Sequence, residues 1–186
     1  MAIPVHKPKR EDILKCVARF DEITSADTGL PDQEIDGYRR TFYNALGFSQ
    51  PAGSGDGSYS PVGDTAQPLI NHLTPGFNLA YVEARPSQGV MMHTHDTNET
   101  FVVIAGTWMF EWEGDQGNDH VVLKERDIVS FEPGSQRRFE CISAPDGADT
   151  GMILGVIGGD TPAAEFSPES IEKMRAAGVE VPQATE

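Results

Sequence analysis

The sequence predicts an all-β protein built as a sandwich or a closed barrel. Short apolar runs rich in valine, isoleucine and aromatic residues recur between residues 77 and 157. Their spacing is roughly ten residues, which is typical of sandwiches and barrels and argues against βαβ units. The 19 glycines and 13 prolines suit the many turns of such a fold. With 186 residues, the chain is long enough for one domain with a substantial core.

Residues 1–65 are expected to form an N-terminal extension and linker. Ile13, Val17 and Phe20 fit one face of a helix, although residues 16–20 fit a strand equally well. Both alternatives stay open, because the segment is short and its apolar residues satisfy either period.

A helix is also expected after residue 31. Pro31–Glu34 has the composition of a helix start, and Tyr38, Phe42 and Leu46 repeat at four-residue spacing. We expect this apolar stripe to cover the barrel or to contact a second subunit. Residues 50–63 are rich in glycine, serine and proline, and are expected to form a loop that flanks the mouth of a site.

The barrel itself is expected over residues 66–162. Its predicted strands are 77–84, 101–104, 107–113, 121–123, 127–131, 137–142 and 152–157. Alternation along 107–113 places Trp108, Phe110 and Trp112 on one face. Residues 114–118 have the composition of a hairpin turn.

Residues 163–186 are expected to form a C-terminal helix and a tail. Ser167 fits the N-cap, Pro168 the first helical position and Gly178 the stop. The helix presents one apolar face, formed by Ile171, Met174 and Ala177. We expect that face to pack against the outside of the barrel.

Two histidines and a glutamate form the strongest candidate site. His93 and His95 lie two residues apart, so on a strand they share one face. Residues 96–98 are turn formers, so Glu99 is expected to begin the next strand facing the two imidazoles. Two neutral imidazoles and one carboxylate make a facial set that first-row divalent metals accept, including non-haem iron(II).

The segment His93-x-His95-x3-Glu99-x6-Gly106 resembles the first motif of the cupin family, G-x5-H-x-H-x3-4-E-x6-G. The leading glycine departs from that motif: its position holds Ser87, and Gly89 stands closer to the histidines. The resemblance implies a cupin double-stranded β-helix, or jelly-roll barrel. It also implies a divalent metal, with iron, manganese, nickel and zinc all open.

Residues 126–141 look similar to the second cupin motif, G-x5-P-x-G-x2-H-x3-N, with Gly134 at its inner glycine. The resemblance covers about residues 77–160. Arg137 takes the place of the family's third histidine, and Cys141 takes that of the asparagine. Since arginine does not ligate metals, three protein ligands are expected, namely His93, His95 and Glu99.

Arg137 admits several interpretations. If it faces inward, its guanidinium could clamp a substrate carboxylate or enolate oxygen, which would make Arg137 and Glu99 the catalytic pair. It could instead pair with Glu99 and replace the metal, or lie with Arg138 at an exposed strand end. A register slip of one residue would turn Gln136 inward. The expected substrate pocket consists of Arg137, Phe139, Cys141, Met91, Trp108 and Phe110.

The other histidines are expected to be ordinary surface residues. His72 or His120 would supply a further ligand only if a loop folded over the mouth. Cys16 and Cys141 are too few for a disulfide framework, which suits a reducing cytoplasm.

The charge and hydropathy of the chain exclude several partner classes. A net charge of -15 argues against nucleic acid and anionic membranes as partners. No apolar run approaches the ~20 residues of a membrane span, and the first ten residues lack an apolar signal core. A homodimer is expected from the cupin resemblance and from residues 101–104, which are apolar on both faces.

The function that fits best is a metal-dependent cupin enzyme acting on a small molecule, most simply dioxygenase-like, with an isomerase or lyase of the cupin type as the other enzyme class left open. Its substrate would be a chelating hydroxy-carbonyl compound or carboxylate, polarised by the metal. Two alternatives stay open: a non-catalytic cupin that binds or senses a small anion, and a metal-free barrel filled by a Glu99–Arg137 pair.

Overall fold

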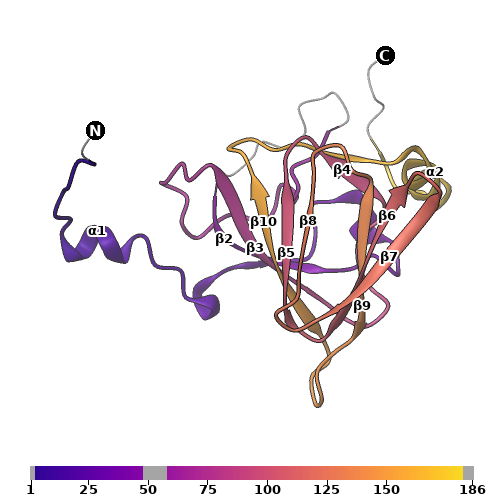
Figure 1. Ribbon diagram of the computed structural model, residues 1–186, viewed down its shortest axis with the longest axis horizontal. Helices are drawn as coiled ribbons and strands as arrows, with labels where there is room; N and C mark the ends of the chain where they lie inside the picture. The colour runs from indigo at the N-terminus through magenta and orange to yellow at the C-terminus, as the bar shows by residue number, and fades with distance from the viewer. Residues whose placement is uncertain (1–2, 48–57, 182–186) are drawn as a thin grey trace.

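The computed structural model describes residues 3–47 and 58–181 and contains two antiparallel β-sheets. Sheet A has the order β1-β2-β3-β10-β5-β8, and sheet B the order β11-β4-β9-β6-β7. The strands of sheet A are β1 (Ser25–Ala26), β2 (Thr41–Leu46), β3 (Phe77–Ala84), β10 (Gly151–Gly158), β5 (Glu99–Ala105) and β8 (Ile128–Phe131). Those of sheet B are β11 (Ala164–Phe166), β4 (His93–His95), β9 (Arg137–Ser143), β6 (Thr107–Gly114) and β7 (Gly117–Lys124). The sheets face each other as a jelly-roll barrel (Figure 1), which confirms the all-β prediction.

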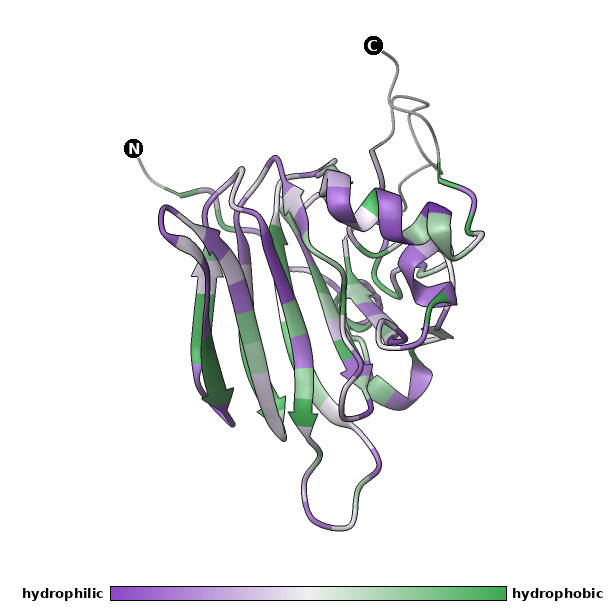
Figure 2. Ribbon diagram, turned by 90° about the vertical axis from the view of Figure 1, so that its right-hand side faces the viewer, coloured by the Kyte–Doolittle hydropathy of each residue, from purple (hydrophilic) through white to green (hydrophobic). Residues whose placement is uncertain are grey.

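The core lies between the two sheets because the strands alternate between buried and more exposed residues. Strands β3 and β10 alternate along their whole length, and hydrophobic and hydrophilic stretches interchange along the ribbons in Figure 2. Phe139 packs edge-on against both Phe101 and Trp108, with ring centroids 5.3 and 5.9 Å apart. These aromatic rings join the two sheets across the barrel.

The helix predicted over residues 38–46 is wrong, because residues 41–46 form strand β2. This strand pairs with β3, and Phe42 faces Val82 in the register. A spacing of four residues is also a multiple of the strand period of two, so the same apolar positions fit a strand. Pro31–Glu34 is only a short 3-10 helix, η2. Much of the loop expected at 50–63 lies outside the described residues.

The start of the chain stands away from the barrel. Helix α1 (Arg10–Leu14) has no buried residue, and Figure 1 shows it beyond the side of the barrel where β2 and β3 lie. A short 3-10 helix, η1 (Phe20–Glu22), follows it. Neither an extended helix nor a strand therefore spans residues 13–20.

A buried ion pair fixes the rest of the extension to the barrel. Arg40 donates hydrogen bonds to both carboxylate oxygens of Asp32, at 3.0 Å each, and to the carbonyl oxygen of Gly89 at 3.2 Å. The Asp32 carboxylate also accepts a hydrogen bond from the Met91 amide at 3.1 Å. Since Gly89 and Met91 directly precede the histidine strand, this pair sets where that strand begins.

Helix α2 (Pro168–Ala176) lies across one end of the barrel. The Ser167 hydroxyl accepts a hydrogen bond from the Ser170 amide, which confirms the predicted N-cap. Gly178 follows the helix with a φ of 82°, a conformation that favours glycine. Met174 is fully buried in a cluster with Met91 and Phe166. The helix therefore packs against residues that flank the histidine strand β4. The tail from 182 onward lies outside the described residues.

The barrel draws strands from both sides of the expected 66–162 segment. Strand β2 comes before it in the chain and pairs with β3. Strand β11 comes after it and pairs with β4. The chain segments that flank the motif-bearing region are thus part of the two sheets.

Candidate metal centre

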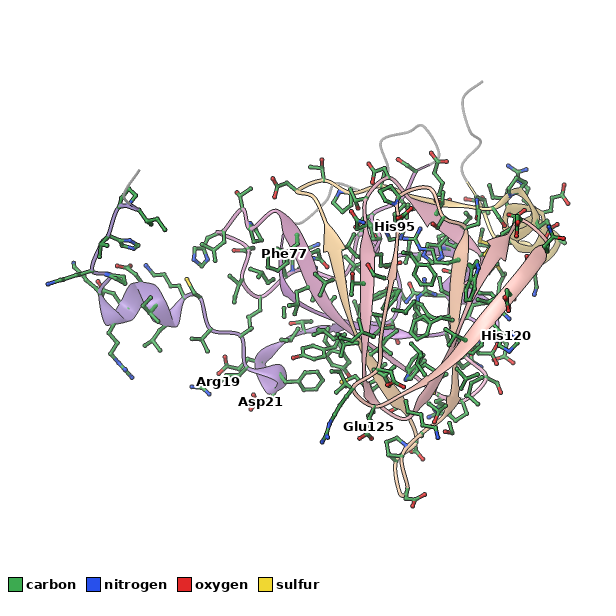
Figure 3. All side chains as sticks on the ribbon, in the orientation of Figure 1. Arg19, Asp21, Phe77, His95, His120 and Glu125 are labelled. Atoms are coloured by element: carbon green, nitrogen blue, oxygen red, sulfur yellow. The ribbon has the colours of Figure 1, made fainter. Side chains whose placement is uncertain are left out.

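The two histidines and the glutamate meet inside the barrel from opposite sheets. His93 and His95 are the two ends of the short strand β4 in sheet B, and both are buried. Glu99 begins β5 in sheet A and is also buried. The turn between them is anchored where the Asp96 carboxylate accepts a hydrogen bond from the Ala163 amide at 2.8 Å. Figure 3 shows His95 within one end of the barrel.

The geometry of these groups suits one ion. One candidate ligand atom from each residue lies within 4.8 Å of the others. His93 Nδ1 is 2.8 Å from the Met91 carbonyl oxygen, which leaves Nε2 available. His95 Nδ1 is buried without a hydrogen-bond partner, and His95 Nε2 lies 4.0 Å from Glu99 Oε1. A buried nitrogen without a partner is a costly feature that a bound ion or water would relieve.

Both imidazoles are held in the neutral form that ligates metals. Burial lowers the pKa of His93 well below its ordinary value, and the neighbouring His95 and Arg137 lower it further. Burial also lowers the pKa of His95 well below its ordinary value, with Arg137 adding to the effect. At neutral pH the site therefore presents two neutral nitrogen donors and one carboxylate.

Arg137 contacts Glu99. It lies on β9, opposite His93 in the register, and its side chain is only 1% exposed. Its Nε and Nη2 donate to Glu99 Oε2 at 3.0 and 2.9 Å, and its Nη1 donates to the Ser135 carbonyl oxygen at 3.0 Å. The guanidinium therefore points inward and grips one oxygen of Glu99. The other oxygen, Oε1, stays on the side of His95.

The residues expected to line a substrate pocket are dispersed. Phe139 lines a small cavity together with His93 and Glu99. Trp108, Phe110 and Cys141 are completely buried in the central core, and Met91 belongs to the separate cluster beneath helix α2. None of these last four residues borders the cavity beside His93 and Glu99.

That cavity has a volume of about 20 Å³, which accepts an ion or a water molecule. Part of its wall comes from residues that the sequence did not indicate, namely Arg40, Phe42, Pro61 and Val62. Phe42 belongs to β2, which was expected to be helical, and Arg40 directly precedes that strand. No local signal marked this strand, because residues 41–46 do not alternate apolar with polar side chains and the inward Asn44 is polar.

His72 and His120 lie away from the candidate metal centre. His120 is exposed on the outer strand β7, as Figure 3 shows. His72 is exposed, with its Nε2 3.7 Å from Cys16 Sγ. Within residues 3–47 and 58–181, His93, His95 and Glu99 are the only metal-competent group of three. Two imidazoles and a carboxylate with an unsatisfied nitrogen fit a divalent first-row ion.

Among the described residues, no helix is both long and apolar enough to span a membrane. No protein-family model matches the chain, and no curated protein matches it.

Solved structures are similar to this chain in fold. A vicilin from Solanum melongena aligns with a TM-score of 0.55 and 12% identity over 86% of this chain and 36% of its own. A vicilin from Corylus avellana (hazelnut) has a TM-score of 0.51 and 12% identity, over 82% of this chain and 36% of its own. This chain thus spans about a third of the length of those vicilins. The iron(II) protein HppE, solved with its substrate, aligns at a TM-score of 0.48 and 11% identity over 76% of this chain and 59% of its own.

The two sheets and the likeness to the two vicilins define a double-sheet, jelly-roll β-barrel. The chain therefore has the fold that the resemblance of residues 93–106 to the first cupin motif predicts.

Proposed function

We propose that this chain is a metal-dependent cupin in which His93, His95 and Glu99 hold one divalent first-row ion: iron, manganese, nickel or zinc. The observation that carries the proposal is the buried convergence of the three side chains, with ligand atoms within 4.8 Å of one another. Burial keeps both imidazoles neutral, and His95 Nε2 lies 4.0 Å from Glu99 Oε1, a separation that one bound ion can bridge.

The activity we propose is that of a small-molecule cupin enzyme, dioxygenase-like, on a chelating hydroxy-carbonyl compound or carboxylate. When bound, the ion supplies Lewis acidity and open coordination positions. Arg137 holds Glu99 by Oε2, so the carboxylate keeps a fixed orientation with Oε1 towards His95. Phe101 and Phe139 give the cavity beside His93 and Glu99 an apolar, aromatic wall.

The cavity volume bears differently on the two parts of this proposal, namely metal binding and turnover of an organic substrate. The cavity beside His93 and Glu99 has a volume of about 20 Å³, which is room for one ion or one water molecule, although His95 does not border it. An organic substrate is larger, so turnover requires the cavity walls to move apart. Arg137 is positioned to orient Glu99, and it would reach a substrate oxygen only after releasing one of its two bonds to that carboxylate.

A second candidate function is a non-catalytic barrel without metal. The observation in its favour is the Arg137–Glu99 ion pair, which already neutralises the buried carboxylate. The Solanum melongena vicilin holds different anionic ligands in structurally similar pockets, which fits a cupin that binds a small anion. The two candidates differ in whether Glu99 Oε1 and the imidazoles take up an ion.

Elemental analysis of untagged protein decides between the candidates. We expect about one divalent ion per chain, and loss of that ion in His93→Ala and in Glu99→Gln. His120→Ala is the matched control, because it removes an exposed histidine of sheet B and should keep the metal. Protein that stays metal-free after exposure to all four ions, while remaining folded, would overturn the metal proposal and leave the second candidate.

If metal binds, activity is tested by oxygen consumption with a panel of hydroxy-ketones, diketones and hydroxy-acids, with and without each ion. Metal-dependent turnover lost in His93→Ala supports the enzyme. A full complement of metal without turnover of any class would retain the metal site and reject the activity.

A further inference from the structure

The buried charges of this protein form two neutral pairs. Among the residues that the structure describes, the buried acidic side chains are Asp32 and Glu99, and the buried basic side chains are Arg40 and Arg137. Arg40 bonds to Asp32, and Arg137 bonds to Glu99, at distances of 2.9 to 3.0 Å. Each buried carboxylate is therefore matched by one guanidinium, a group that stays charged in proteins.

Both guanidinium groups lie beside the candidate metal centre. Arg40 lines the small cavity together with His93 and Glu99, and Arg137 lies opposite His93 in the strand register. Burial lowers the pKa of both His93 and His95, so the two imidazoles are neutral at pH 7. The buried side chains around the centre therefore sum to zero charge before any ion enters.

Arg137 is the cause of this balance. It stands where the second cupin motif has a histidine, so this chain has a permanent cation at the place of a neutral ligand. Two neutral imidazoles and a free carboxylate would offset one charge of a divalent ion. Here Arg137 has already offset the carboxylate of Glu99, so a bound divalent ion leaves two positive charges uncompensated. Burying uncompensated charge is costly, because low-dielectric surroundings solvate it poorly.

We propose that this site takes up its divalent ion together with a small anion, and that the charge of Arg137 couples the two. The inference rests on the proposed metal centre and narrows its substrate class to carboxylates. A chelating carboxylate, such as that of an α-hydroxy acid, cancels charge that the ion brings, whereas a neutral hydroxy-ketone does not. Coupling of this kind is reciprocal, so the ion must tighten the binding of the anion by the same factor.

Manganese(II) titrations of the metal-free, full-length protein test the coupling. The unbound ion is measured by its electron paramagnetic resonance signal, with perchlorate as the only other small anion in the buffer. The probes are glycolate and glycolamide, which share a hydroxyl group and a shape but differ in charge. Glycolate should raise the affinity for manganese about tenfold or more, and glycolamide should leave it unchanged. A titration without protein corrects for complexes of manganese with glycolate alone.

Three variants test whether the charge at residue 137 causes the effect. Arg137→Gln keeps an N–H donor but removes the cation, so manganese should bind more tightly without glycolate than in the wild type, and the gain from glycolate should shrink. Arg137→Lys keeps the charge and should keep the gain. Arg138→Gln is the matched control, because Arg138 bonds to Glu111 on the opposite face of the sheet and its loss should not change the gain. Circular dichroism establishes that the variants are folded.

The outcomes separate this inference from the proposed function. Equal manganese affinity with glycolate, with glycolamide and with neither would overturn the coupling and leave the metal centre in place. A gain from glycolate that a folded Arg137→Gln retains in full would overturn the role of Arg137. Should that variant not fold, calorimetry on the wild type decides, since glycolate must bind the manganese-loaded protein more tightly than the metal-free protein by the factor that the titration gives. Absence of manganese binding under every condition would reject the metal centre itself, and the coupling with it.

Discussion

Two buried arginine–carboxylate pairs in this barrel use their carboxylates differently. Arg40 bonds to both oxygens of Asp32, one of which also accepts the Met91 amide. Arg137 places both of its bonds on a single oxygen of Glu99 and leaves the other oxygen near His95. The side chains of both pairs are at most 5% exposed. The two pairs are therefore equally buried but differ in how many carboxylate oxygens accept hydrogen bonds. Both oxygens of Asp32 are occupied, which suits a role in the fold, whereas Glu99 keeps Oε1 available for a bound ion.

The Asp32–Arg40 pair should show the largest effect on stability. Asp32→Ala removes one partner, leaves the Arg40 guanidinium buried without its counter-charge, and frees the segment that leads into β4. We expect the free energy of unfolding to fall by about 3–5 kcal/mol, measured by urea denaturation followed by tryptophan fluorescence. A loss below about 1 kcal/mol, the range of exposed pairs, would contradict a structural role for this pair.

Metal should restore the stability lost when Arg137 is removed, whereas it should not compensate for the loss of Asp32. Arg137→Met leaves the Glu99 carboxylate buried and unpaired, so the metal-free variant should lose about 3 kcal/mol. An ion bound by His93, His95 and Glu99 replaces the missing positive charge. At a metal concentration of 100 times Kd, it should restore about 2.7 kcal/mol.

The control for this comparison is Asp32→Ala, which should gain no more from metal than the wild type gains. Equal metal-induced stabilisation in Arg137→Met and in a His93→Ala variant would show that the ion binds elsewhere.

Acid should destabilise the metal-free protein through its two buried histidines. Burial lowers the pKa of His93 and His95 well below the ordinary value of 6.5. The folded chain therefore binds fewer protons at these groups than the unfolded chain does, so stability rises with pH. Their contribution is complete above 6.5 and is lost as the pH falls towards the folded pKa values, at up to about 1.4 kcal/mol per unit for each group.

Urea midpoints at pH 7 and below measure this slope. We expect a smaller slope in His95→Gln, whereas His120→Ala, at an exposed histidine, should retain the wild-type slope. An unchanged slope in His95→Gln would mean that His95 does not titrate as a buried neutral group.

The sequence indicated the barrel and the three candidate ligands because both depend on local patterns. The period of two along residues 77–84 and 152–157 gave strands that the structure contains. His93 and His95 could be placed on one face because strand alternation is a property of the backbone. The capped helix after Ser167 was equally local, since its hydrogen bond spans three residues.

What the sequence did not indicate depends on pairing between distant segments. Tyr38, Phe42 and Leu46 satisfy a helical and a strand period alike, and only the pairing of β2 with β3 decides. Arg137 could be assigned an inward direction from alternation, but its choice of Glu99 over an open pocket depends on how β9 faces β5 across the barrel. The same limit explains why Trp108 and Phe110 were placed in the expected pocket, since a core residue and a pocket wall have the same pattern.

A third arginine, Arg138, is expected to contribute least to stability. It follows Arg137 on the same strand and faces the opposite side of the sheet. Its guanidinium also bonds to a carboxylate, that of Glu111, at 2.7 and 2.9 Å. The two side chains of that pair are 26% and 18% exposed, so water shares in solvating them. We expect Arg138→Met to cost about 1 kcal/mol or less in urea unfolding and to leave metal content unchanged. A cost equal to that of Arg137→Met would mean that the short contact distances, rather than burial, determine the strength of these pairs.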